Sequence, residues 1–282
     1  MKKVLLTGAT GFVGKNIYPI LSERYDIIAP KRDELNILDL SEVRDYLASY
    51  KFDVVIHSAN PNPVKNHICD KEETMFQESL RMFYNFYNNR RLYGKMIYFG
   101  SGAEYDKSAD IIDATEDDIN KRIPNDDYGL AKLYMNELAR NSENVYNFRL
   151  FGCYGPYDYK TKFLTHVINC CLYKDEITIN QDCLFDYIRV SDVAGILCYA
   201  IDNELKYKDY NICSGKKILL SEIAERIKKK MKDDIPVRII KDGLNKEYTG
   251  NNSRITEETG YTFMDIDTGI DLQIEHERSK IS

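Results

Sequence analysis

The sequence predicts a doubly wound α/β protein: a mainly parallel sheet with helices on both faces, joined to a smaller α/β lobe toward the C-terminus. Short apolar segments alternate with segments of helical periodicity through the first half of the chain. Residues 4–7 form an apolar strand that runs into Gly8, Gly11 and Gly14 and then into a helix. The length of 282 residues fits one large domain or two closely joined smaller ones.

The three glycines predict a phosphate-binding turn. Gly8 lets the chain leave the strand sharply, Gly11 lets the backbone approach a pyrophosphate, and Gly14 lets the following helix pack on the strand. An anion would then lie at the positive end of that helix. The alternative is an ordinary strand–turn–helix connection. The residues expected to hold a dinucleotide here are Gly8, Thr10, Gly11, Phe12, Val13 and Gly14.

The end of the second predicted strand, residues 25–29, indicates the type of dinucleotide. NAD sites usually carry a carboxylate there, whereas the 2′-phosphate of NADP requires cations. Lys31 and Arg32 come first in this chain, and Asp33 follows them. We therefore expect NADPH (NADP⁺ when oxidised) as the cofactor, with Arg32 making the forked contact. The alternative is an exposed turn that carries two surface cations.

Helical spacing over 40–51 and an apolar segment over 52–57 continue the alternation. Ala59 lies two residues beyond this strand, and ligands of open parallel sheets lie beyond the carboxyl ends of the strands. We therefore expect Ala59 to contact the cofactor. His57, inside the strand pattern, is expected to be a packed histidine and not an acid or base.

A catalytic group is predicted beyond the next strand, residues 95–100. That strand ends at Ser101, and a helix up to Arg140 carries Tyr128 and Lys132 on one face because they are four residues apart. A neighbouring ammonium and an oxidised nicotinamide would lower the tyrosine pKa from its usual value near 10. Tyr128 could then protonate a carbonyl as hydride arrives, with Ser101 orienting that oxygen. The alternative is a Tyr and a Lys on an ordinary surface helix.

These motifs resemble the extended branch of the short-chain dehydrogenase/reductase superfamily, the NAD-dependent epimerase/dehydratase family. Residues 32–39 are similar to the same stretch of GDP-fucose synthase and related sugar-nucleotide 4-ketoreductases. The resemblance implies that Asn36 and Ile37 flank the adenine ring and that Lys132 holds the nicotinamide ribose beside Tyr128. It implies a Rossmann cofactor domain over 1–158 and about 184–203, and a substrate lobe over 159–183 and 204–282.

Two departures from the family narrow the implied reaction. Sugar-nucleotide dehydratases carry an Asp-Glu pair where this chain has Gly102 and Ala103, and GDP-fucose synthase epimerises with a Cys and a His where this chain has Ala103 and Tyr157. We therefore expect reduction of a 4-keto-6-deoxy sugar nucleotide, without 3,5-epimerisation, for surface polysaccharide synthesis. The alternatives are a sugar-nucleotide 4-epimerase that retains NAD, and a redox-sensing protein that binds NADPH without turnover.

The substrate motifs depart further. Gly152 stands where the family has Asn, and Phe185 where it has an arginine that grips a phosphate or the base. We expect Lys162, at the head of a helix over 160–172, to contact a phosphate, and Arg254 to replace the missing arginine. The expected substrate contacts are Ser101, Gly102, Ala103, Tyr157, Lys162 and Arg254.

A helix predicted over 72–91 carries a stripe of methionine and aromatic side chains that is wider than one buried face requires. In the family, this helix and the Tyr-Lys helix pack against a second subunit. We therefore expect a homodimer. The alternative is that the stripe belongs to the core of one chain.

Composition argues against several other classes. Hydrophobic residues make up 43% and charged residues 30% of the chain, as in ordinary soluble proteins, and the net charge of −6 disfavours nucleic acid or anionic membranes as partners. Without a spanning segment or a signal-peptide core, the protein is expected to be cytoplasmic. The seven cysteines form no C-x-x-C pair and the four histidines show no ligand spacing, so we expect reduced thiols and no metal.

Overall fold

A parallel sheet forms the centre of the computed structural model, which describes residues 1–61 and 74–281. Within this part of the chain, six strands pair in the order β10-β6-β4-β3-β1-β2, and every pair is parallel. The strands are β1 (Lys3–Thr7), β2 (Asp26–Ile28), β3 (Val54–His57), β4 (Lys95–Ser101), β6 (Val145–Leu150) and β10 (Asp209–Ile212). The order changes direction between β1 and β3, and open α/β sheets bind ligands beyond such a switch point.

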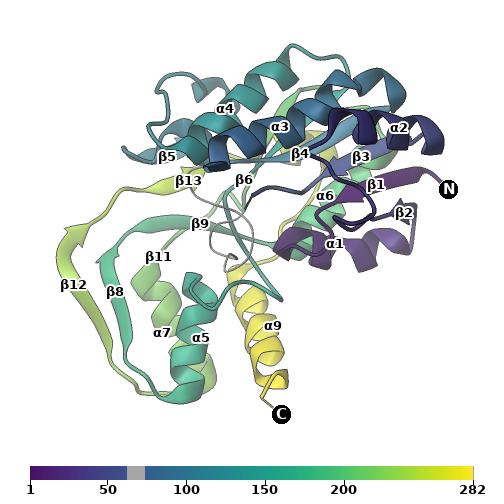
Figure 1. Cartoon of the computed structure of the whole chain (residues 1–282). Helices are drawn as coiled ribbons and strands as arrows, with labels where there is room; N and C mark the ends of the chain where they lie inside the picture. The colour runs from purple at the N-terminus through teal and green to yellow at the C-terminus, as the bar shows by residue number, and fades with distance from the viewer. Residues whose placement is uncertain (62–73, 282) are drawn as a thin grey trace.

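Helices cover both faces of this sheet (Figure 1). One face carries α2 (Leu40–Tyr50), α3 (Met75–Asn88) and α4 (Asp127–Arg140), and the other carries α1 (Phe12–Ser22) and α6 (Val190–Asp202). Successive side chains of a strand point to opposite faces, so Leu5 packs with the first helix layer while Val4 and Leu6 pack with the second. The predicted doubly wound fold is confirmed.

A smaller lobe lies below the sheet in Figure 1. It contains α5 (Phe163–Tyr173), α7 (Leu220–Met231), α9 (Ile266–Ser279) and the paired strands β8 (Ile177–Asp182) and β12 (Val237–Leu244). Its core is a separate cluster of mainly aliphatic side chains. A second sheet joins this lobe to the first body, in the order β11 (Lys217–Leu219), β9 (Leu184–Arg189), β13 (Tyr248–Gly250) and β5 (Ile111–Ala114), with β7 (Gly152–Tyr154) paired to β9.

Three element boundaries differ from the prediction. Strand β10 belongs to the six-stranded sheet although the expected substrate lobe included it, because it covers the edge that β6 would otherwise expose. Helix α1 begins at Phe12 and includes Gly14, whereas the prediction placed the helix after the third glycine. The helix predicted over 72–91 is α3, and residues 72 and 73 lie outside the described residues.

The described residues carry six cysteines, and all six are free thiols; Cys69 lies outside them. In the same ranges, no His, Cys, Asp or Glu cluster is arranged to hold a metal ion. None of the helices described here has the length and apolar character needed to span a bilayer.

Candidate active site

The glycine turn has the shape of a phosphate cradle. Gly8 adopts a φ of +72°, and a Cβ on it would lie 2.7 Å from the Ala59 backbone nitrogen. A Cβ on Gly14 would lie 2.2 Å from the Gly8 carbonyl oxygen, so this glycine allows α1 to pack on the turn. Gly11 is the N-cap of α1 and provides no side-chain cap, which leaves the first amides of the helix for an anion. These residues fit a dinucleotide diphosphate.

The floor of this cradle is tied to the neighbouring strand β3. The Thr7 hydroxyl lies 3.0 Å from Nδ1 of His57 and accepts a hydrogen bond of 3.2 Å from the Ala59 amide. His57 is buried, and burial lowers its pKa to about 3, with the Lys132 charge as a smaller cause. His57 is therefore a neutral, packed histidine, as predicted.

The residues expected at the adenosine end lie beyond β2. Lys31 and Arg32 are both exposed, and the Lys31 amide donates to the Glu34 carboxylate at 2.7 Å. The Asn36 side-chain oxygen accepts from the Leu38 amide, and the Ile37 carbonyl accepts from Asn85 on α3 at 2.8 Å. This turn is thus fixed by hydrogen bonds from within the chain and leaves the two cations on its surface.

Strand β4 and helix α4 bring the three catalytic candidates together. Ser101 is the last residue of β4; its hydroxyl accepts from the Ala103 amide at 3.2 Å and is close enough to the Tyr128 phenol to affect the pKa of that phenol. The Lys132 ammonium donates to the Phe99 carbonyl at 2.8 Å and lies 5.8 Å from the centre of the Tyr128 ring. Asp126 begins α4 by accepting from the Gly129 amide at 2.9 Å. The predicted spacing therefore gives a converging serine, tyrosine and lysine.

The pKa of Tyr128 differs from the prediction. Burial raises the pKa of its phenol, and the hydrogen bond with Ser101 opposes that rise. Burial also lowers the pKa of Lys132 to about 8, against a smaller effect of the Glu104 charge. Burial therefore outweighs the effect of Ser101, and the Tyr128 pKa is raised where the sequence predicted that it is lowered.

A buried ion-pair chain beneath Ser101 was not predicted. Glu104 accepts from the Ser101 amide at 3.0 Å and pairs with Arg149 at 2.8 Å, and both charged side chains are fully buried. Arg149 reaches Asp209 on β10 at 3.1 Å, and Asp209 in turn pairs with Arg254 at 3.0 Å. The pattern Ser-x-x-Glu at 101–104, a capping box, was the signal in the sequence that could have identified Glu104.

Tyr248 is a second residue that the sequence did not identify. It comes from β13, and its hydroxyl lies beside Gly102 and close enough to Ser101 for that side chain to affect the pKa of the phenol. Burial raises the pKa of Tyr248 well above its usual value, so it is a neutral phenol at physiological pH. No local motif marks it, because the pairing of β13 with β9 and β5 brings it beside Ser101.

The expected substrate residues are divided between two places. Gly102 and Ala103 are buried directly beside Ser101. Tyr157 lies 5.3 Å from the His276 ring of α9, and Lys162 is exposed at the start of α5. Arg254 pairs with Asp209, Asp117 and Glu116, so its charge is matched by carboxylates of the chain itself. These ion pairs argue against Arg254 as a substrate contact.

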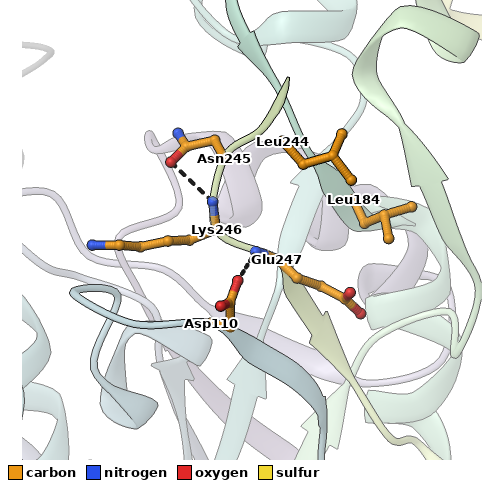
Figure 2. A pocket seen from close by; sticks show the side chains of 6 residues that line it. All are labelled: Asp110, Leu184, Leu244, Asn245, Lys246 and Glu247. Carbon is orange, nitrogen blue, oxygen red and sulfur yellow. Dashed lines mark hydrogen bonds between the residues drawn. The ribbon is translucent and has the colours of Figure 1, made fainter. Parts of the chain in front are cut away.

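A cavity of about 460 Å³ lies near the start of β13 (Figure 2), and it is lined by Asp110, Leu184, Leu244, Asn245, Lys246 and Glu247. Leu184 and Glu247 precede Phe185 and Tyr248, and neighbouring side chains on a strand face opposite ways. None of Ser101, Tyr128 and Lys132 lines this cavity. We therefore place the candidate active site at the converging side chains.

Comparisons with known proteins agree with this geometry. A model described as the NAD dependent epimerase/dehydratase family matches residues 4–213. GDP-L-colitose synthase of Yersinia pseudotuberculosis is 28% identical over 263 residues, covering 80% of this chain and 81% of that protein.

Two solved structures share the fold across almost the whole chain. GDP-L-fucose synthetase from Naegleria fowleri bound to NADP has a TM-score of 0.84 at 14% identity, covering 99% of this chain and 93% of its own. UDP-glucose 4-epimerase from Thermotoga maritima has a TM-score of 0.80 at 18% identity, covering 99% and 100%. The family match spans the glycine turn, the Tyr-Lys helix and all six strands of the central sheet. The chain therefore belongs to the NAD-dependent epimerase/dehydratase family.

Proposed function

We propose that the protein is an NADPH-dependent reductase of a 4-keto-6-deoxy sugar nucleotide, serving surface polysaccharide synthesis in the cytoplasm. The observation that carries this proposal is the convergence of Ser101, Tyr128 and Lys132 at the carboxyl edge of a sheet whose first strand ends in a phosphate cradle. Family membership supports chemistry on sugar nucleotides.

In this proposal each catalytic residue has one task. The Ser101 hydroxyl, on a residue whose backbone amide is held by Glu104, donates a hydrogen bond to the substrate carbonyl oxygen. The Tyr128 phenol gives its proton to that oxygen, and solvent returns a proton to the phenolate. Lys132, buried with a pKa of about 8, is mostly charged at neutral pH and stabilises the phenolate. NADPH, when bound, supplies the hydride that the carbonyl carbon accepts.

A screen of keto-sugar nucleotides tests the reaction. Purified protein would be mixed with NADPH and with GDP-, CDP-, UDP- or dTDP-linked 4-keto-6-deoxy sugars, and loss of absorbance at the NADPH band would be followed. We expect oxidation with one base, and GDP is tested first because the 28% identical relative is named for a GDP sugar. No oxidation with any of the four would refute the reductase.

Absence of epimerisation is tested without NADPH. Ala103 has no group that can carry a proton, so incubation with the keto-sugar in heavy water should leave the ring carbons undeuterated. Deuterium at carbons 3 and 5 would show that another residue performs the epimerisation.

The alternative is a sugar-nucleotide 4-epimerase, which shares the Ser-Tyr-Lys set. The similarity to the Thermotoga maritima epimerase supports it at the level of fold alone. Purified protein that retains NAD, and interconverts sugar nucleotides without added cofactor, would favour this alternative over exchangeable NADPH.

A further inference from the structure

Three aromatic side chains form a continuous row that starts at the catalytic serine. Phe185 and Tyr187 come from β9, and Tyr248 from the neighbouring β13. The ring centres of Phe185 and Tyr248 are 4.8 Å apart at an angle of 29°, and those of Phe185 and Tyr187 are 4.8 Å apart at 32°. All three side chains are half-buried. We call Tyr248, Phe185 and Tyr187 the aromatic wall.

Two glycines make room for this wall. A Cβ on Gly102 would lie 2.4 Å from the Tyr248 hydroxyl oxygen, and a Cβ on Gly152 would lie 2.5 Å from the Phe185 ring. Side chains at either position would therefore displace a ring. Gly102 stands where sugar-nucleotide dehydratases carry Asp, and Gly152 stands where the family resemblance predicts Asn; the rings of the wall fill the space beside both.

The wall also has a fixed position relative to the reacting atoms. The Tyr248 hydroxyl lies against Gly102, the residue after Ser101, and the Ser101 side chain acts on the pKa of that phenol, so one end of the wall lies beside the hydroxyl that would hold the substrate carbonyl. The far end, Tyr187, lines a second cavity of about 280 Å³. A sugar with its carbonyl carbon at Ser101 must therefore place neighbouring ring carbons against Tyr248 and Phe185.

We propose that the aromatic wall binds the deoxygenated, apolar side of the sugar, and that Phe185 determines the preference for deoxy over hydroxylated sugars. This inference rests on the proposed function. C–H groups of a sugar pack well on aromatic faces, whereas a hydroxyl pressed against a ring loses its water and finds no hydrogen-bond partner. An apolar surface of this kind discriminates against an added hydroxyl by about 10²-fold at most.

Binding measurements with unreactive ligands test the wall by itself. Calorimetry would compare GDP, GDP-L-fucose and GDP-L-galactose, the last of which adds one hydroxyl at carbon 6, or the matching set on another base if the screen identifies one. For Phe185→Leu we expect about ten-fold weaker binding of the deoxy sugar nucleotide, a reduced preference over the hydroxylated one, and unchanged binding of the nucleotide alone. Phe185→Tyr should retain the affinity for the deoxy sugar nucleotide and the preference over the hydroxylated one. Phe263→Leu changes another half-buried phenylalanine and serves as the control.

Two results would overturn the inference. An equal loss of affinity for the nucleotide alone would show that the ring stacks on the base, and unchanged affinity for all three ligands would show that Phe185 contacts neither. If the wild type reduces no keto-sugar and Phe185→Leu still weakens binding of the deoxy sugar nucleotide alone, the proposed function is refuted but the role of the aromatic wall is supported.

Discussion

Ser101 receives more interactions than any other catalytic candidate. Its amide donates to Glu104, its hydroxyl accepts from the Ala103 amide, and the Tyr128 and Tyr248 phenols lie near enough for Ser101 to affect their pKa values. These contacts restrict the Ser101 side chain, so its hydroxyl is already in position to orient the carbonyl oxygen when substrate arrives. At the residue scale, the proposed catalytic geometry is therefore built around Ser101, which is held through both its amide and its hydroxyl. Tyr128 is the proposed proton donor.

Replacing Tyr128 with Phe should lower kcat by about 10²–10⁴-fold, because the proton donor is lost while the ring remains. Steady-state NADPH oxidation measures kcat, and fluorescence titration should show unchanged NADPH binding. Tyr134→Phe, on the exposed face of the same helix, is the matched control. Equal activity of Tyr128→Phe and wild type would instead support a binding protein without turnover.

His57 should make stability depend on pH. Its pKa of about 3 in the folded protein lies below the 6.5 of an unfolded histidine, so the unfolded state binds more protons between these values. The contribution of neutral His57 to the free energy of unfolding is thus fully present above pH 6.5, and it falls by about 1.4 kcal/mol for each pH unit below that value. Urea unfolding at pH 7, 6 and 5 measures this, and His57→Gln should give a flatter dependence over the same window.

At the scale of elements, a chain of ion pairs links the turn after β4 to β6, β10 and α8 (Ser253–Thr259). Its members are Glu104, Arg149, Asp209 and Arg254. Buried charges of this kind add little net stability as a set, because desolvation offsets their attraction. Removal of one partner is costly, since it leaves the other charge buried and unmatched.

Arg149→Met should therefore destabilise the protein by about 3–5 kcal/mol, measured from urea unfolding. The double variant Glu104→Gln with Arg149→Met should lose less than the sum of the single variants, because it removes the unmatched charge. Additive losses would show that the two side chains do not act as a pair.

The sequence predicted the elements of the cofactor half well because their signals are local. Short continuous apolar runs indicate β1 and β3, and four-residue spacing places Tyr128 and Lys132 on one face of α4. The contacts of Tyr248 and Arg254 could not be predicted in this way, because strand and helix pairing brings each of them to residues more than a hundred positions earlier. The sequence shows that Phe185 replaces an arginine of the family. Its contact with Gly152 could not be predicted, because that contact depends on the pairing of β7 with β9.

At the scale of the whole molecule, α3 carries both buried and exposed aromatic side chains. Met75, Met82, Phe83 and Phe86 are buried, so much of it belongs to the core of one chain. Tyr84 on α3 is 39% exposed and Tyr134 on α4 is 53% exposed. We propose that these two helices form the interface of a homodimer, as the family resemblance implies.

Light scattering at micromolar concentration tests the homodimer. Wild type should give twice the mass of the chain, and Tyr134→Arg should shift it toward one chain, because two buried guanidinium groups would face each other across a symmetric interface. Lys51→Arg, outside α3 and α4, is a control that should not change the mass. A monomeric wild type would refute this proposal.

The place of β10 at the edge of the central sheet affects how this enzyme can be divided. A recombinant fragment that ends at residue 158 would lack β10 and Asp209. Strand β6 would then be an unpaired edge strand, which promotes aggregation, and Arg149 would lose one of its two carboxylate partners. We therefore expect that the fragment over residues 1–158 does not fold by itself. Expressed alone, it should collect in inclusion bodies, and split reporters or gene fusions based on this chain need to keep residues up to Arg254 on the same polypeptide.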